Sequence, residues 1–288
     1  MKNGYMKTAL LAVSCLAFLT GCKDTSNDYT SYVDPKIGSG GHGHVFVGAN
    51  VPFGMVQLGP TSIPQQWDWC SGYHDSDSTV IGFSHTHLSG TGIGDLFDIT
   101  VMPVTGQVAY SRGREDDPAT GMWSYADRSR EVAKPGYYSV PLTRYGITAE
   151  MTASCYVGMH RYTFPQADDA GIVFNLLNGG CWDRPMDAHI EVVDPQTGER
   201  VKDQTAGSAL RGYRFSRGWA DDQMIYFYAE FSKPFTSIDF INFDVQIWQD
   251  EFKTIPGYAH VHFDTEKDEQ ILMKVALSSV SMEGAYEN

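Results

Sequence analysis

Short runs of β-branched and aromatic residues recur along the chain, and each is bounded by glycine, proline, asparagine or aspartate. Such runs predict strands, and no sustained helical periodicity interrupts them. The expected strands are Val45–Val47, Met55–Leu58, Ile99–Pro103, Tyr137–Leu142, Ile147–Thr152, Ile172–Leu177, His189–Val193, Met224–Phe231, Ile238–Ile241 and Ile271–Ala276. Many short strands separated by turn residues indicate an all-β fold, an antiparallel β-sandwich of two large sheets.

Two segments near the C-terminal end are more apolar than the rest. Met224–Phe231 and Gln270–Leu277 are hydrophobic at nearly every position, which predicts central strands that are covered on both faces. Asp194–Gly198 reads Asp-Pro-Gln-Thr-Gly and predicts a hairpin turn between His189–Val193 and Glu199–Lys202.

The N-terminal end has the pattern of an export signal. Lys2 and Lys7 flank or precede an apolar run, Ala9–Leu19, that is too short to span a bilayer comfortably. The run ends in Leu-Thr-Gly-Cys22, which resembles a bacterial lipobox. We therefore expect residues 1–21 to be a lipoprotein signal peptide and Cys22 to be lipidated. The protein would then be exported and lipid-anchored to the outer membrane, at its periplasmic face or at the cell surface.

The acidic balance of the chain excludes one class of partner. The formal net charge is −14, and removal of residues 1–21 takes away Lys2 and Lys7, which moves it to −16. Nucleic-acid phosphates need a basic surface, so no nucleic-acid partner is expected. Hydrophobic residues make up 42% of the chain and aromatic residues 13%, enough for a substantial core.

Cysteine usage says little about redox chemistry. After Cys22 the chain has Cys70, Cys155 and Cys181, and none belongs to a Cys-x-x-Cys pair, so a structural zinc site is not indicated. One disulfide with one free thiol is a possible arrangement. Three buried thiols is the favoured alternative.

Histidines gather between Ile37 and Met102, where most of the candidate chemistry lies. His42 and His44 stand two apart in Gly-Gly-His-Gly-His, and in an extended segment such residues point the same way. With His85 and His87 they could form a four-histidine metal site. The favoured interpretation is that these histidines bind loops or a polar ligand through hydrogen bonds, or brace two adjacent strands.

The segment Trp67-Asp-Trp-Cys-Ser-Gly-Tyr73 suits a sugar platform. An indole face can cover the C–H side of a pyranose ring, and the Asp68 carboxylate can accept hydrogen bonds from its hydroxyls. The alternative is a pair of core tryptophans, Trp67 and Trp69, with Asp68 capping a turn.

Acidic residues of the same region offer weaker signals. His74–Ser78 could bind calcium through its carboxylates, but it lacks the EF-hand spacing, and a solvated loop is favoured. Gly90–Gly94 lacks the Lys and Ser/Thr of a phosphate-binding loop. Paired carboxylates for glycoside hydrolysis could come from Asp68, Asp75, Asp77, Asp95 and Asp98. Sequence supplies no distances, so these aspartates form a set of candidates and not a site.

Three runs carry the most specific pattern: VDPKIGSGGHGHVFVGANVPFGMVQLGP, WDWCSGYH and IGFSHTHLSGTGIGDLFDITVMP. They resemble the N-terminal domain of glycoside hydrolase family 92, a family of exo-acting α-mannosidases of Bacteroides-type bacteria. The resemblance is dense over Tyr32–Pro103 and continues more loosely through Lys134–Tyr138 and Gly212–Trp219.

The resemblance implies a two-domain enzyme with a β-sandwich followed by an (α/α)₆ barrel. Family members hydrolyse α-mannosides with calcium and invert the anomeric centre, using one carboxylic acid on the leaving oxygen and one carboxylate to activate water. The family's acid, its base and most of its calcium contacts belong to the barrel. We therefore expect no catalytic residue and no metal ligand in this chain, and we take calcium as a cofactor of the full-length enzyme.

The resemblance also implies a domain plan. Residues 22–31 are expected to be a tether, residues 32–280 the N-terminal sandwich, and residues 281–288 the start of a linker to the missing catalytic domain. Ser281 could cap a helix that has barely begun. An apolar surface normally covered by the barrel should then be exposed.

The substrate-binding positions that the family motif implies are Trp67, Asp68, Trp69, Cys70, Gly72 and Tyr73, with His42, His44, His85 and His87 nearby. Trp67 or Trp69 is expected near the −1 mannose, with Asp68 and His85 supporting the loop. The predicted function is the N-terminal domain of an exo-α-mannosidase acting on mannose-containing glycans. The alternatives are a stand-alone surface carbohydrate-binding module and a hydrolase that uses its own aspartates.

Overall fold

The structure is a computed structural model that describes residues 29–114, 116–180 and 182–288. The expected signal peptide, Cys22, most of the expected tether and Cys181 lie outside the described residues. The chain divides into two compact units, 1–33 and 34–288. Of the first unit, residues 29–33 are described, and they contain the 3₁₀ helix η1 (Tyr29–Tyr32). Within the described residues, no helix is both long enough and apolar enough to cross a membrane.

Two large antiparallel sheets dominate the described part of the second unit. The first has the strand order β1 (Ala49–Asn50), β2 (Gln57–Thr61), β4 (Gly82–Ser84), β5 (Thr100–Thr105), β13 (Ala167–Asn175), β18 (Glu251–Thr265) and β17 (Ser237–Trp248). The second has the order β14 (Arg184–Val192), β15 (Gly207–Arg217), β16 (Gln223–Phe235), β19 (Glu269–Ser278), β12 (Val157–Phe164), β11 (Ile147–Ala153), β10 (Tyr137–Leu142) and β9 (Val132–Lys134).

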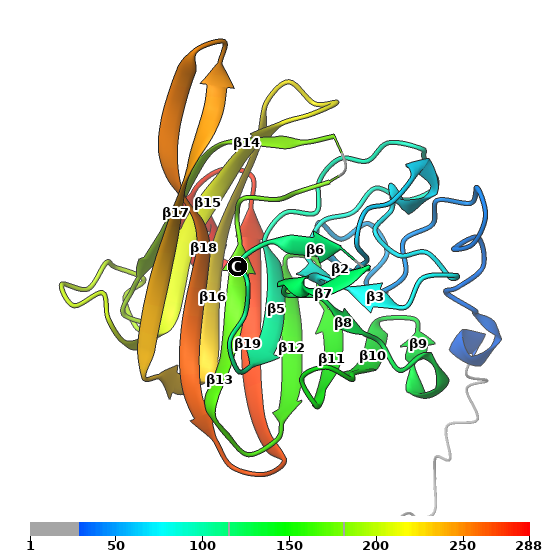
Figure 1. The fold of residues 1–288 in the computed structure, drawn as a ribbon, viewed down its shortest axis with the longest axis horizontal. Helices are drawn as coiled ribbons and strands as arrows, with labels where there is room; N and C mark the ends of the chain where they lie inside the picture. The colour runs from blue at the N-terminus through cyan, green and yellow to red at the C-terminus, as the bar shows by residue number, and fades with distance from the viewer. Residues whose placement is uncertain (1–28, 115, 181) are drawn as a thin grey trace, which may run out of the picture. The chain divides into compact units, whose positions relative to one another are not determined.

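Shorter elements complete the second unit. Two small sheets pair β3 (Thr79–Val80) with β8 (Ser124–Tyr125) and β6 (Arg112–Arg114) with β7 (Asp117–Gly121). The helices are η2 (Trp67–Trp69), η3 (Arg128–Arg130) and α2 (Met282–Glu287). Figure 1 shows the long strands β15 to β19 gathered together, and β3, β6, β7 and β8 among the loops on the other side.

The two large sheets pack through a shared apolar core. Along β12, alternate residues are buried, as a strand with one covered face requires. Phe174 of β13 stacks on Phe227 of β16 with ring centroids 5.9 Å apart, and Phe231 of β16 meets Phe263 of β18 at 5.8 Å. These aromatic contacts join one sheet to the other, so the predicted antiparallel β-sandwich is confirmed.

The central strands and the hairpin turn were predicted at the right positions, but the expectation that both faces are covered is wrong for β19, where Gln270, Leu272 and Lys274 are exposed. Met224–Phe231 lies within β16 and Gln270–Leu277 within β19, and each strand has a neighbour on both sides. In the turn, Gly198 N–H donates to Asp194 O at 2.8 Å. The second arm, expected over Glu199–Lys202, is reduced to one bridge between Val193 and Arg200. The Gln204 side chain bonds to the backbone N–H and C=O of Val192, and Val201 N–H is the backbone donor of the second arm that reaches this C=O.

The expected strand Val45–Val47 is wrong. This segment is buried but irregular, and the first strand begins at Ala49. Its amides bond to loops and not to a neighbouring strand, because Val45 N–H donates to Gly38 O and Phe46 N–H donates to the Ser89 hydroxyl. Apolar character here reflects burial under glycine-rich loops.

The C-terminal helix starts where the sequence indicated. Ser281 is the N-cap of α2, and its hydroxyl accepts from Gly284 N–H at 3.0 Å. Ala285 is fully buried in a small cluster with Tyr228 of β16, so this short helix packs against the second sheet.

The interpretation of three buried thiols is wrong for Cys155, which is exposed. Cys70 is buried. Exposure of Cys155 follows from its position in the tight connection between β11 and β12, where Met55 and Val56 N–H groups bond to its carbonyl.

Candidate functional site

The tryptophan segment folds as the single turn η2, and its two indoles have different surroundings. Trp69 is partly buried: its Nε1–H donates to Asp77 Oδ2 at 2.6 Å, and its ring stacks on His74 at 4.2 Å. Trp67 is 54% exposed, and its Nε1–H donates to Gly92 O at 2.9 Å. A Cβ on Gly92 would lie 2.4 Å from the Trp67 ring, so the indole lies directly on bare backbone. Trp67 is therefore the accessible platform of the pair.

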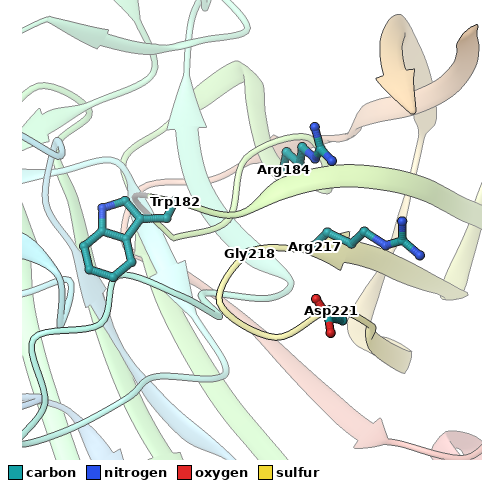
Figure 2. A pocket seen from close by; sticks show the side chains of 5 residues that line it. All are labelled: Trp182, Arg184, Arg217, Gly218 and Asp221. Atoms are coloured by element: carbon teal, nitrogen blue, oxygen red, sulfur yellow. The ribbon is translucent and has the colours of Figure 1, made fainter. Parts of the chain in front are cut away.

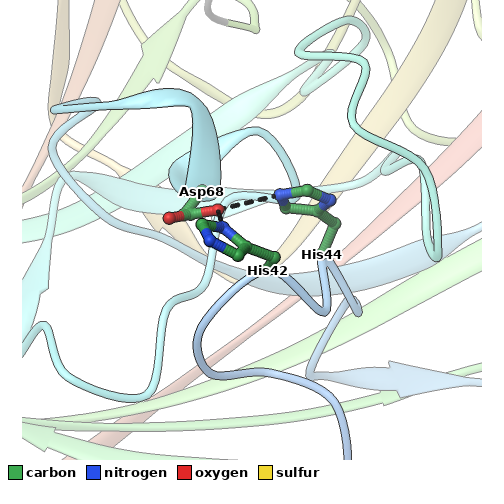
Figure 3. A group of neighbouring side chains, drawn as sticks. All are labelled: His42, His44 and Asp68. Atoms are coloured by element: carbon green, nitrogen blue, oxygen red, sulfur yellow. Dashed lines mark hydrogen bonds and ion pairs between the residues drawn. The ribbon is translucent and has the colours of Figure 1, made fainter.

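Asp68, between the two tryptophans, joins this loop to the histidine loop. His42 Nδ1 lies 2.6 Å and His44 Nε2 lies 3.1 Å from the same oxygen, Asp68 Oδ1 (Figure 3). The His42 hydrogen bond is the main cause that lowers the pKa of Asp68, ahead of the His44 hydrogen bond and against the opposing effect of burial. His44 is buried and meets the Trp67 ring edge-on at 4.3 Å.

His85 lies in the interior and bridges the two sheets. Its Nδ1–H donates to Ile99 O at 2.6 Å, so its Nε2 accepts from His160 Nε2–H at 2.9 Å. His160 Nδ1 then accepts from the Tyr162 hydroxyl at 2.8 Å. Burial lowers the pKa of His85 to about 4, which keeps this chain of hydrogen bonds neutral. His85 lies far inside the protein and has no exposed surface to offer a ligand.

His87 and Tyr73 are also core residues. His87 Nδ1–H donates to Gln57 O at 2.8 Å, and its ring lies between Phe46 and Phe97. The Tyr73 ring lies 4.2 Å beneath the Arg128 guanidinium, and its hydroxyl donates to Glu131. The four-histidine metal site is therefore not formed. His85 and His87 bond to backbone carbonyls in the interior, away from His42 and His44.

An open pocket of about 380 Å³ lies beside Trp67. Its lining includes Gln66, Trp67, the buried Cys70 and Trp182, whose side chain is 49% exposed. Trp182 also borders a second hollow of about 650 Å³ lined by Arg184, Arg217, Gly218 and Asp221 (Figure 2). The two exposed indoles, Trp67 and Trp182, line one pocket and form an aromatic cleft. The sequence analysis did not predict Trp182.

Backbone contacts and a buried ion cluster position Trp182. Its N–H donates to Gly94 O at 2.9 Å, and Gly180 N–H donates to Leu96 O at 2.8 Å. The next residue, Asp183, accepts from Arg214 Nη1 and Nη2 at 2.7 and 2.6 Å. Arg214 is fully buried on β15 and also donates to Asp98 Oδ1 at 2.8 Å.

Asp95 fixes the turn on the far side of the second hollow. Its Oδ2 accepts from Ala220 N–H at 3.0 Å. A Cβ on Gly218 would lie 2.1 Å from Asp95 Oδ1, so only glycine fits there. The loops that carry the exposed indoles and Arg217 are thus held by carboxylates beneath them.

Most of the nominated aspartates therefore have structural partners. Asp98 bonds Arg214 and Thr86, Asp95 bonds the turn at Ala220, and Asp77 accepts from Trp69 and from Thr79 N–H. The calcium interpretation of His74–Ser78 gains no support, because Asp77 is committed in this way.

Across the described residues, the one group of three potential ligand residues whose ligand atoms lie close together is His42, His44 and Asp68. Calcium takes six to eight oxygen ligands, so two imidazoles and one carboxylate do not fit it.

Comparison with known proteins identifies the fold. Residues 32–278 match the family model for the glycosyl hydrolase family 92 N-terminal domain. The chain belongs to glycosyl hydrolase family 92.

Solved family 92 structures agree with this assignment. A family 92 α-mannosidase from Bacteroides thetaiotaomicron, solved with mannoimidazole and without it, is 34% identical with a TM-score of 0.79, over 90% of this chain. A family 92 inverting mannosidase from B. thetaiotaomicron VPI-5482 is 23% identical with a TM-score of 0.68, a likeness of fold alone. The chain covers 33% of the first relative and 32% of the second.

One curated relative extends the comparison beyond bacteria. A protein of Arthroderma benhamiae described as an uncharacterized secreted glycosidase is 31% identical over 148 residues, which is 48% of this chain and 18% of that protein. This family 92 chain therefore spans about a third or less of the length of these relatives.

Among the motif positions of this family 92 chain, Trp67 and Cys70 line the aromatic cleft, and Asp68, His42 and His44 form the neighbouring cluster. Trp69, Tyr73, His85 and His87 support the loops from within. Trp182 follows Gly-Gly-Cys, a glycine-rich loop signal, and this pattern was the available clue to it.

Proposed function

We propose that this chain is the N-terminal part of a calcium-dependent exo-α-mannosidase that acts on mannose-containing glycans and inverts the anomeric centre. In this proposal the cleft between Trp67 and Trp182 contributes the rim of the sugar site. One observation carries it: two exposed indoles line a single pocket in a chain 34% identical to a family 92 α-mannosidase.

The chemistry of the cleft suits a pyranose ring. Indole faces cover the apolar C–H surface of a sugar, and such contacts bury apolar surface area without the need for a charged partner. Trp67 lies on the backbone of Gly92, and Trp182 is tied to Gly94 and, through Asp183, to Arg214. Because the Trp67 indole and the backbone that carries Trp182 are held in this way, little conformational entropy would be lost when a sugar binds.

The catalytic acid and base are proposed to lie in the part of the enzyme that this chain does not span. Asp95 and Asp98 are buried and bonded to structural partners, so they are poor donors or acceptors for a leaving oxygen or a water. Calcium, when bound in the full enzyme, would supply positive charge for sugar hydroxyls. Its ligands are assigned to the same catalytic domain, which is the proposed partner of this one.

Export is part of the proposal. The lipobox-like sequence before Cys22 and the similarity to a secreted glycosidase support secretion followed by lipid anchoring to the outer membrane. Metabolic labelling with a lipid precursor, compared between the natural protein and Cys22→Ser, tests it. Label that persists in Cys22→Ser would contradict the anchoring.

The main test compares tryptophan variants in the full-length natural protein. Trp67→Ala and Trp182→Ala should each lower kcat/KM for α-mannosides about fivefold or more, the loss expected for an aromatic contact of about 1 kcal/mol. Trp248, exposed near the end of β17 and outside the cleft, gives the matched control Trp248→Ala. Equal activity of all three variants and the parent would overturn the proposal.

A second function is favoured by the completeness of the cleft within this chain. Every residue lining the Trp67–Trp182 pocket belongs to one compact unit, so the chain could act as a surface carbohydrate-binding module. The two functions differ in one measurement, which is mannose release by the full-length natural protein with calcium and with a chelator. Mannoside binding without release under either condition supports the binding module.

A further inference from the structure

The cluster of His42, His44 and Asp68 has a geometry that sugar binding alone does not require. Two imidazole nitrogens approach one carboxylate oxygen at 2.6 and 3.1 Å, and the three ligand atoms all lie within 4.8 Å of one another. We propose that these three residues form a binding site for a divalent cation of the zinc class. This inference stands on the cluster itself and does not depend on the proposed mannosidase function.

The donor set selects the class of metal. Zinc and related first-row cations bind imidazole nitrogen together with carboxylate oxygen, whereas calcium and magnesium prefer oxygen alone. Nitrogen and oxygen ligands lie about 2.0–2.2 Å from zinc, so ligand atoms around one ion are about 3–3.5 Å apart. The observed spacing reaches that arrangement with small side-chain movements.

The loop that carries His42 and His44 has a backbone conformation that few sequences can adopt. His44 has φ 54°, a left-handed conformation that is uncommon outside glycine. A Cβ on Gly43 would lie 1.9 Å from Gly38 O, so the residue between the histidines must be glycine. Gly90 N–H also donates to His44 O at 2.7 Å. Strained backbone that neighbouring contacts hold in place often marks a site where side chains must be aimed.

The cluster opens toward solvent on one side. His44 is buried against Trp67, while the His42 side chain is 78% exposed. Three protein ligands with an accessible side is the arrangement of zinc sites that keep a position for water or for a ligand oxygen. A bound cation would tie the histidine loop to η2, and so to the Trp67 platform.

The test is a metal titration of the purified full chain after removal of bound metal. Calorimetry with Zn²⁺ should show one site per chain, and Co²⁺ should give the visible absorption of a nitrogen and oxygen site. His42→Ala is the main variant, because this exposed side chain can be removed without disturbing the fold. It should weaken zinc binding more than about 100-fold, beyond the 10–100-fold that loss of an outer-shell partner costs.

The matched control is His189→Ala. His189 is also an exposed imidazole beside a carboxylate, 3.2 Å from Glu191, but no second histidine joins that pair. Its removal should leave zinc affinity unchanged. The proposal is overturned if the parent binds no zinc, if His42→Ala binds like the parent, or if the cobalt spectrum shows a thiolate band that places the metal on a cysteine. The first of these results would leave the cluster as a hydrogen-bonded clamp.

Discussion

Arg214 does not line the candidate site, but we expect its substitution to destabilise the loop that carries Trp182. This guanidinium is fully buried on β15 and makes four hydrogen bonds, at 2.8 Å to Asp98, at 2.7 and 2.6 Å to Asp183, and at 3.0 Å to Leu176 O. Replacing it in Arg214→Met keeps the length of the side chain and removes the charge and every donor.

The expected cost follows from what remains behind. Asp98 and Asp183 have side-chain exposures of 0% and 1%, so the variant leaves two buried carboxylates without a countercharge. Breaking a buried pair in this way costs about 3–5 kcal/mol. For a domain of this size that is roughly 6–20 °C in Tm. Neutralising both acids as well, with Asp98→Asn and Asp183→Asn, should restore most of the stability, because no buried charge is then left unpaired.

The assay is urea unfolding followed by tryptophan fluorescence. The matched control is Arg161→Met, since Arg161 also bonds a carboxylate through two donors, Nε at 2.7 Å and Nη2 at 2.5 Å from Glu150. That pair is exposed to solvent, so its loss should cost about 0–1 kcal/mol. The reasoning is refuted if Arg214→Met destabilises the protein no more than Arg161→Met does.

Two further predictions use the same unfolding assay. Burial lowers the pKa of His85 and of His87 from 6.5 to about 4, so the unfolded chain takes up protons first, and stability should fall as pH drops from 6.5 toward 4, by roughly 3 kcal/mol for each histidine. A flat profile over that range would contradict the assigned burial. Gly218→Ala places a Cβ 2.1 Å from Asp95 Oδ1 and should cost about 1–3 kcal/mol, whereas Gly40→Ala, with no atom nearer than 3.5 Å, should be nearly neutral. Equal midpoints for the two glycine variants would argue against the close approach.

The sequence predicted the strands that are apolar and missed those that carry buried polar residues. Met224–Phe231 is readable as a strand because nearly every position in it is apolar, with one face buried and the other largely covered. β15 was not predicted, since Arg211, Arg214 and Arg217 interrupt its alternation. β12 was missed for a similar reason, with His160 at a buried position. In each strand the polar side chain is satisfied by a residue distant in sequence, and the sequence gives no sign of that partner.

The same limit applies to the candidate site. The residue types of Trp67–Tyr73 were enough to predict a sugar platform. They could not predict which of the two indoles, Trp67 or Trp69, is exposed. The exposure of each indole depends on a tertiary contact. Trp67 packs on the backbone of Gly92, and Trp69 donates a hydrogen bond to Asp77 in the interior. Trp182 was missed because a single tryptophan in a glycine-rich loop becomes a candidate only when it shares a pocket with another aromatic residue.

Buried polar contacts therefore connect the sandwich to the site. His85 and His160 join the first sheet to the second, 75 residues apart in sequence, close to the loops that carry the motif. Arg214 joins β15 to Asp98 and to Asp183, the neighbour of Trp182. An apolar core of the same shape could hold the strands together, but it could not fix where these loops stand. Polar residues inside the sandwich thus help to position the loop that carries Trp182, which is why substitution of Arg214 should alter this loop as well as lower the free energy of unfolding.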